Sequence, residues 1–115
     1  MLSLDQLKEF GADTTEGLAR CMNNEAFYLK MIGMGLRDER FEAMKGVIES
    51  KDYDTAFEMA HALKGVLGNL ALAPIYGPMS EMTELLRAKV ADADYMSYYN
   101  TVKEQRDKLL AMIDA

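Results

Sequence analysis

Apolar side chains return every three, four or seven residues along most of the chain, and this spacing constrains the fold more than any other feature. In the proline-free stretch 25–49, the recurring positions are Tyr28, Leu29, Ile32, Leu36, Ala43 and Val47. Side chains at these spacings share one face of an α-helix. No segment alternates with period two, and no Asn-Gly or Asp-Gly pair marks a hairpin. The sequence therefore predicts an all-α protein.

Turn and capping residues divide this pattern into short and long helices. Residues 1–22 are expected to form short helices, followed by four longer ones at 25–49, 53–71, 78–89 and 94–114. Pro78 is expected to begin its helix after an irregular turn at 74–77, because proline lacks an N–H and strains a helix already under way. Long amphipathic helices joined by short turns favour an antiparallel up-and-down four-helix bundle, here capped by the short N-terminal helices. At 115 residues, the chain is expected to be a single domain, 1–115.

Composition and charge exclude several classes of function. The net charge of −6 argues against binding nucleic acid or an anionic membrane surface, since both are held by Lys and Arg. Cys21 has no cysteine to pair with, and with a single histidine no clustered zinc ligand set exists. The N-terminus lacks the pattern of a signal peptide, and no apolar run approaches the ~20 residues of a membrane span. We expect a soluble, cytoplasmic protein that binds no metal or cofactor.

The segment from Glu58 to Leu70 carries the only histidine of the chain, His61, on a face of unusual composition. Lys64, Gly65 and Gly68 follow His61 at three, four and seven residues, which places all four on one stripe of a helix. The opposite face is apolar, with Met59, Leu63, Val66, Leu67 and Leu70. His61 is therefore predicted to be exposed to solvent in the middle of a helix.

These residue types suit phosphoryl transfer. A neutral imidazole is a nucleophile, and its ordinary pKa near 6.5 leaves much of it neutral in a cell. Lys64 could pair with the added negative charge. Gly65 and Gly68 cost helix stability but allow the backbone of another protein to approach. Phe57, expected to be exposed one turn before His61, would offer that partner an apolar contact.

The string H-A-L-K-G-V-L-G-N-L resembles the signature of the histidine phosphotransfer (HPt) domain family, H-x-L-K-G-x-x-x-x-L. The resemblance covers most of the chain, since the segment Thr15 to Leu29 and the pair Asp52-Tyr53 are also similar to such domains. Two features depart from the family: many members have glycine where Ala71 stands, and the Gly77-Pro78 pair is not typical.

The resemblance implies a phosphorelay intermediate on a four-helix bundle. His61 would be the phosphorylated residue, Lys64 would steady the phosphoryl group, and Gly65 and Gly68 would give the partner clearance. The partners would be receiver domains of response regulators, with a hybrid sensor histidine kinase as a further candidate. The Mg²⁺ and the acidic pocket belong to the receiver, so the chain should need no cofactor and should be a carrier without catalysis of its own.

Two other interpretations compete with this one. The first is an HPt-like binding or adaptor module whose histidine is not phosphorylated. The second is the dimerisation segment of a sensor kinase, which is disfavoured because those segments usually carry His-Glu with a proline soon after, whereas Ala62 follows His61. An autonomous enzyme is also disfavoured, because no general base is paired with a nucleophile in the sequence.

Overall fold

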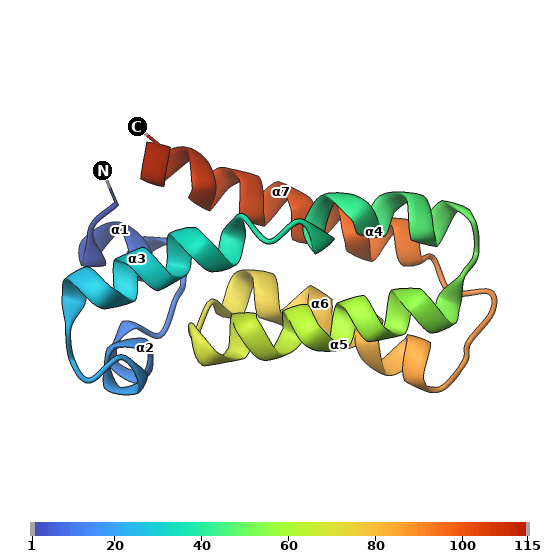
Figure 1. Cartoon of the computed structure of the whole chain (residues 1–115), viewed down its shortest axis with the longest axis horizontal. Helices are drawn as coiled ribbons and strands as arrows, with labels where there is room; N and C mark the ends of the chain where they lie inside the picture. Colours follow the sequence, from blue (N-terminus) through green and yellow to red (C-terminus); the bar gives the residue numbers. More distant parts are fainter. Residues whose placement is uncertain (1, 115) are drawn as a thin grey trace.

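The computed structural model describes residues 2–114, which form seven α-helices and no strand (Figure 1). The prediction of an all-α fold is confirmed. The helices, in chain order, are α1 (Leu4–Phe10), α2 (Thr14–Arg20), α3 (Glu25–Leu36), α4 (Arg40–Glu49), α5 (Tyr53–Asn69), α6 (Ala73–Arg87) and α7 (Tyr95–Asp114).

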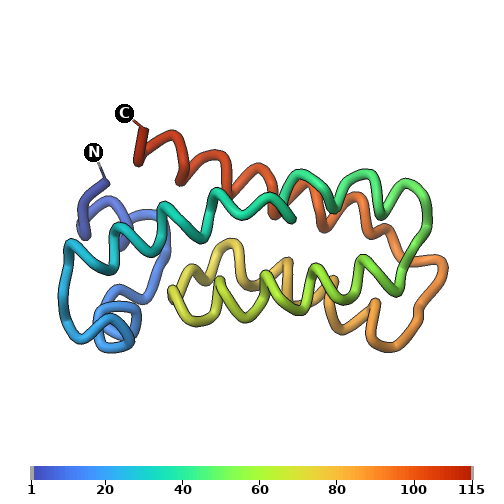
Figure 2. The backbone as a smooth tube through the Cα atoms, viewed as in Figure 1, coloured from blue at the N-terminus to red at the C-terminus, as the bar shows by residue number. Residues whose placement is uncertain are grey.

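The expected single helix over 25–49 is wrong, because the chain breaks between α3 and α4 (Figure 2). Asp38 provides a local cause: its carboxylate accepts a hydrogen bond from the backbone N–H of Arg40 at 2.9 Å and so caps the start of α4. The break also exposes the last carbonyl of α3, on Leu36, which accepts a hydrogen bond from Nε of Arg106 at 2.7 Å. A side chain from α7 therefore replaces a bond that a continuous helix would have made.

The expected irregular turn at 74–77 and the helix over 78–89 are also corrected. Helix α6 already begins at Ala73, so Pro74 occupies its first turn and Pro78 lies inside it. Proline normally disfavours a helical residue before it, because its ring crowds the Cβ of that residue. Gly77 has no Cβ, which removes this part of the clash and lets the helix pass through Pro78.

The other two long helices lie close to their expected bounds. Helix α5, expected at 53–71, ends at Asn69, and α7, expected at 94–114, begins at Tyr95. Asp52 caps α5 as predicted, since its carboxylate accepts a hydrogen bond from the N–H of Thr55 at 3.2 Å.

The helices from α4 to α7 pack around a shared core. Each contacts the next along the chain and α7 contacts α4, while consecutive helices run in opposite directions (Figures 1 and 2). The fully buried side chains come from every long helix and include Ile32, Leu36, Met44, Leu63, Leu67, Ile75, Met79, Met82, Val102 and Leu109. Most of the apolar stripes read from the sequence are buried here.

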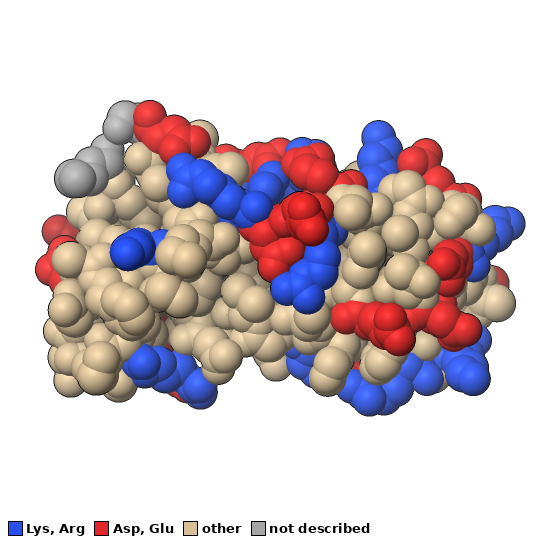
Figure 3. Space-filling view, viewed as in Figure 1, with Lys and Arg blue, Asp and Glu red and all other residues tan. Residues whose placement is uncertain are grey.

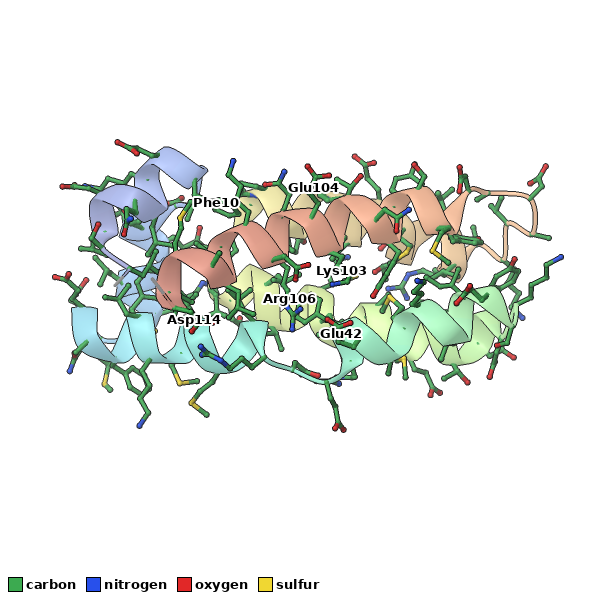
Figure 4. All side chains as sticks on the ribbon, turned by 90° about the horizontal axis from the view of Figure 1, so that it is seen from above. Phe10, Glu42, Lys103, Glu104, Arg106 and Asp114 are labelled. Carbon is green, nitrogen blue, oxygen red and sulfur yellow. The ribbon has the colours of Figure 1, made fainter. Side chains whose placement is uncertain are left out.

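Arg106 of α7 is the one arginine of the described chain that is buried. Its guanidinium bonds the α3 carbonyl described above and carboxylates of Glu42 and Asp107, at 3.0 and 2.9 Å. Figure 4 shows Arg106 and Lys103 on α7 turned toward Glu42 on α4. These contacts join α7 to both sides of the α3–α4 break.

The N-terminal helices are joined to the turn between α5 and α6. The phenol of Tyr28 on α3 donates a hydrogen bond to the carbonyl of Leu70 at 2.7 Å, and the N–H of Asp13 donates to the carbonyl of Ala71 at 3.0 Å. Gly17 of α2 lies against the ring of Tyr28, where a Cβ would collide with it. These hydrogen bonds therefore attach the N-terminal helices to the residues that follow the C-terminal end of α5.

On the face drawn in Figure 3, charged residues are unevenly distributed, and few of them lie over α2 and α3. Met22, Phe27 and Met34, from this part of the chain, are exposed. Among the residues described, no helix has the length and apolar character needed to cross a bilayer.

Candidate functional site

The residues singled out in the sequence lie on the solvent-facing side of α5, toward α6 and α2. The other side of α5 buries Ala56, Ala60, Leu63 and Leu67 completely. This buried stripe fixes the rotation of the helix about its axis, so the opposite face, which carries His61 and Gly65, must face outward. His61 and Gly65 are exposed, and Lys64 and Gly68 are half-buried, as the helical spacing predicts.

The imidazole of His61 is held from one side by an aromatic ring. Phe57, one turn earlier on α5, stacks on it with ring centroids 5.7 Å apart and planes 17° from parallel. The guanidinium of Arg87, near the end of α6, lies over the same phenyl ring at 5.0 Å from its centroid. Arg87 thus packs on Phe57, and Phe57 packs on His61. These contacts limit the rotation of the imidazole, while the histidine remains exposed to solvent.

The position of Phe57 differs from the expectation. It is half-buried and packed against the core, not exposed. It also lies beside a separate hollow between α5 and the end of α6, lined by Asp54, Phe57, Glu58, Leu86, Arg87 and Lys89. The structure thus places Phe57 on the other side of His61 from the two glycines.

Lys64 is paired within the molecule. Its ammonium lies 3.2 Å from Oε1 of Glu84 on α6, and Oε2 of the same carboxylate lies 3.3 Å from Nε of Arg87. These two cations hold the pKa of the Glu84 carboxyl below its usual range, chiefly through the hydrogen bond from Lys64. Glu84 is therefore an anion at neutral pH, and it is paired with Lys64, which lies one helical turn after His61 on α5.

The two glycines differ in the space around them. A Cβ built on Gly65 would meet no atom within 4 Å, whereas one on Gly68 would lie 3.2 Å from Cε2 of Tyr76 on α6. Gly65 therefore opens directly to solvent beside the imidazole. Gly68 instead allows the ring of Tyr76 to pack closely over α5.

A groove of about 580 Å³ runs from His61 toward the N-terminal helices. Arg20 of α2 closes its far side, where the guanidinium donates to Glu16 at 2.8 Å and to Asn69 of α5 at 3.1 Å. The groove brings together four of the five predicted site residues and is lined by Asp13, Glu16, Arg20, His61, Lys64, Gly65, Leu67, Gly68, Asn69, Ala71, Leu72, Ala73 and Tyr76.

The sequence did not indicate the residues that other helices contribute to the site. Glu84 and Arg87 on α6, and Arg20 on α2, contact α5 only because of how the helices pack. A signal for the first pair was present, since Glu84 and Arg87 flank the apolar pair Leu85-Leu86 and would border the neighbouring helix. Nothing in the sequence paired them with Lys64 in particular.

Within residues 2–114, no group of three or more His, Cys, Asp or Glu side chains is arranged to hold a metal ion. The groups available for chemistry at this site are an exposed imidazole, the ammonium of Lys64, and the guanidinium groups of Arg87 and Arg20. No family model, curated protein or solved structure matches this chain.

Proposed function

We propose that this protein is a phosphorelay intermediate that carries a phosphoryl group on His61. The observation that supports this most strongly is the exposed imidazole in the middle of α5, with Lys64 half-buried beside it and open space over Gly65. Under this proposal α3 and α4 together form one arm of an antiparallel four-helix bundle with α5, α6 and α7, and α1 and α2 cap one end, in the manner of the HPt domains that the motif resembles.

The reaction is a reversible exchange between two proteins. An unprotonated nitrogen of His61 attacks the phosphorus of an aspartyl phosphate on a receiver domain, so that a P–N bond forms while the P–O bond to the aspartate breaks. The aspartate leaves as a carboxylate, and the Mg²⁺ that belongs to the receiver would compensate negative charge during the transfer. Transfer to a second receiver reverses these steps.

The chain contributes positioning and charge, not autonomous catalysis. Phe57 stacks on the imidazole and limits its rotation, which favours a productive orientation. Lys64 lies one turn after His61 on the same face, within reach of a phosphoryl group on the outer nitrogen. Gly65 leaves clearance for the surface of the receiver.

The experiment that tests this proposal is transfer from a phosphorylated receiver domain. Wild-type protein should acquire label that is labile in acid and stable in base, and His61→Gln should acquire none. Label that persists in His61→Gln, or no label in wild type with its native receiver, contradicts the proposal. The second outcome would favour an HPt-like adaptor module whose histidine is not phosphorylated.

A matched pair of glycine variants tests the docking clearance. Gly65 and Gly46 both lie in helices with open space at the Cβ position, but only Gly65 is near His61. Gly65→Glu should slow transfer at least tenfold through bulk and charge, whereas Gly46→Glu should leave it unchanged. Equal transfer rates for the two variants would show that close approach at Gly65 is unimportant.

A further inference from the structure

Lys64 of α5 and Arg87 of α6 share one counter-ion, the carboxylate of Glu84. Lys64 can steady a phosphoryl group on His61 only if its ammonium is available, yet it is paired with Glu84 at 3.2 Å. A carboxylate in this position competes with the phosphoryl group for the same cation. It also adds negative charge close to where the phosphoryl group would arrive.

Glu84 is suited to releasing Lys64 because its two oxygens have different partners. Oε1 faces the ammonium of Lys64, while Oε2 faces Nε of Arg87, three residues further along α6. When Lys64 moves to another anion, the carboxylate keeps Arg87 as a counter-ion. Arg87 is itself fixed over the ring of Phe57, so it remains in place during the exchange.

We propose that Glu84 is a positioning residue that holds Lys64 while His61 is unmodified and yields it to the phosphoryl group when the P–N bond forms. This inference rests on the proposed function. Because Glu84 competes for Lys64, it makes phosphohistidine less stable relative to the unmodified protein. The phosphoryl group is therefore easier to transfer to the next receiver. Because Glu84 is exposed, we expect it to change the equilibrium between unmodified and phosphorylated His61 by only about two- to fivefold.

The titration of the phosphoryl group reports this competition directly. Pairing with an ammonium favours the dianionic phosphoryl group over the monoanion, so it lowers the pKa of the phosphohistidine. Protein treated with phosphoramidate should form phosphohistidine without any receiver, because the P–N bond of the donor breaks and ammonia leaves. The pH dependence of its ³¹P resonance then gives the pKa.

Glu84→Gln should increase the ionisation constant of the phosphoryl group about two- to fivefold, because Lys64 becomes fully available. Removing any nearby carboxylate has some effect through space, so Glu81→Gln, an exposed glutamate on the same helix, is the charge-matched control. In a Lys64→Gln background, the effect of Glu84→Gln should fall to that of Glu81→Gln. Thermal unfolding of each variant should match that of wild type to within a few degrees.

Each outcome bears on a different claim. If wild type forms no phosphohistidine, the proposed function and this inference both fail. If wild type forms it and Glu84→Gln has the same effect with and without Lys64, the proposed function stands and the role of Glu84 is overturned. A Glu84→Gln effect no larger than that of Glu81→Gln in the wild-type background overturns it as well.

Discussion

Ala71 shows at the scale of one residue how the end of α5 is built. Its backbone has a φ of +57°, in the left-handed region that favours glycine. The N–H of Leu72 donates to the carbonyl of Leu67 at 3.1 Å, and the N–H of Ala71 donates to Gly68 at 3.1 Å, so this turn satisfies the last carbonyls of the helix. The left-handed backbone at this position is one that glycine adopts without strain.

Ala71→Gly should therefore stabilise the protein. Relief of the left-handed strain outweighs the greater freedom of glycine in the unfolded chain, for a net gain of about 0.5–1 kcal/mol. Urea denaturation followed by circular dichroism measures this difference. The control is Ala88→Gly, because Ala88 ends α6 with a right-handed φ of −78° and should gain nothing. A gain at both positions would show that the strain at Ala71 is not its source.

The sequence predicts contacts between site residues on the same helix, but not those between residues on different helices. The shared face of His61, Lys64, Gly65 and Gly68 follows from spacing within one helix, which local geometry fixes. The ion pair between Lys64 and Glu84 joins residues on two helices. Its formation depends on the rotation and offset of α5 against α6, which no local pattern specifies.

At the scale of elements, the break between α3 and α4 is the clearest failure of periodicity. The apolar stripe over 25–49 continues on both sides of the break, so spacing alone predicts one helix. Two features compete with it: the carboxylate of Asp38 caps a new helix, and Arg106 binds the carbonyl of Leu36. The first is a local signal that the sequence contained, while the second is tertiary.

Asp38→Ala distinguishes a capped break from a continuous helix. Alanine is the better helix former, so the substitution would stabilise an uninterrupted helix, but loss of a cap should destabilise the protein by about 1 kcal/mol. Hydrogen bonds from Arg40, chiefly from its guanidinium at 2.6 Å and also from its backbone N–H, lower the pKa of Asp38. The stability that the Asp38 carboxylate contributes is therefore present at neutral pH and is lost as the pH falls through that lowered value.

Chemical denaturation at pH 7 and near pH 2.5 measures both effects. Asp38→Ala should be less stable than wild type at pH 7, and the difference should shrink at the lower pH. The control is Glu39→Ala, since Glu39 makes no side-chain capping bond and should change the stability by a few tenths of a kcal/mol at most. Increased stability of Asp38→Ala would contradict the cap.

At the scale of the whole molecule, two tyrosine phenols tie distant segments together. Tyr28 bonds the carbonyl of Leu70, and Tyr99 bonds the carbonyl of Phe41, each at 2.7 Å and each in a buried setting. The sequence indicated an apolar stripe that includes Tyr28, and Tyr99 lies within the last predicted helix, 94–114. It could not indicate which carbonyls they would reach, because those belong to residues 42 and 58 positions away.

Tyr28→Phe should loosen the attachment of the N-terminal helices to the rest of the molecule. The buried carbonyl of Leu70 would lose its partner, which costs about 1–2 kcal/mol. Burial raises the pKa of Tyr28 to about 12, above the value near 10 expected in an unfolded chain. This contribution to stability is thus complete below pH 10 and is lost as the pH rises from 10 to 12.

Urea denaturation at several values between pH 8 and pH 11.5 tests this linkage. The stability of wild type should fall more steeply above pH 10 than that of Tyr28→Phe, because the variant lacks one phenol that must ionise. Identical slopes for wild type and Tyr28→Phe would contradict the burial of that phenol as an ionising group.

The central claim is that His61 accepts the phosphoryl group on the nitrogen far from the main chain, which points out from α5. Protein labelled with ¹⁵N in histidine, phosphorylated and examined by long-range ¹H–¹⁵N correlation and ³¹P coupling, identifies the modified atom directly. We predict a single phosphohistidine with the P–N bond at Nε2 of His61. Phosphate at Nδ1, phosphate on another residue, or an unmodified imidazole in protein that carries label would contradict the account.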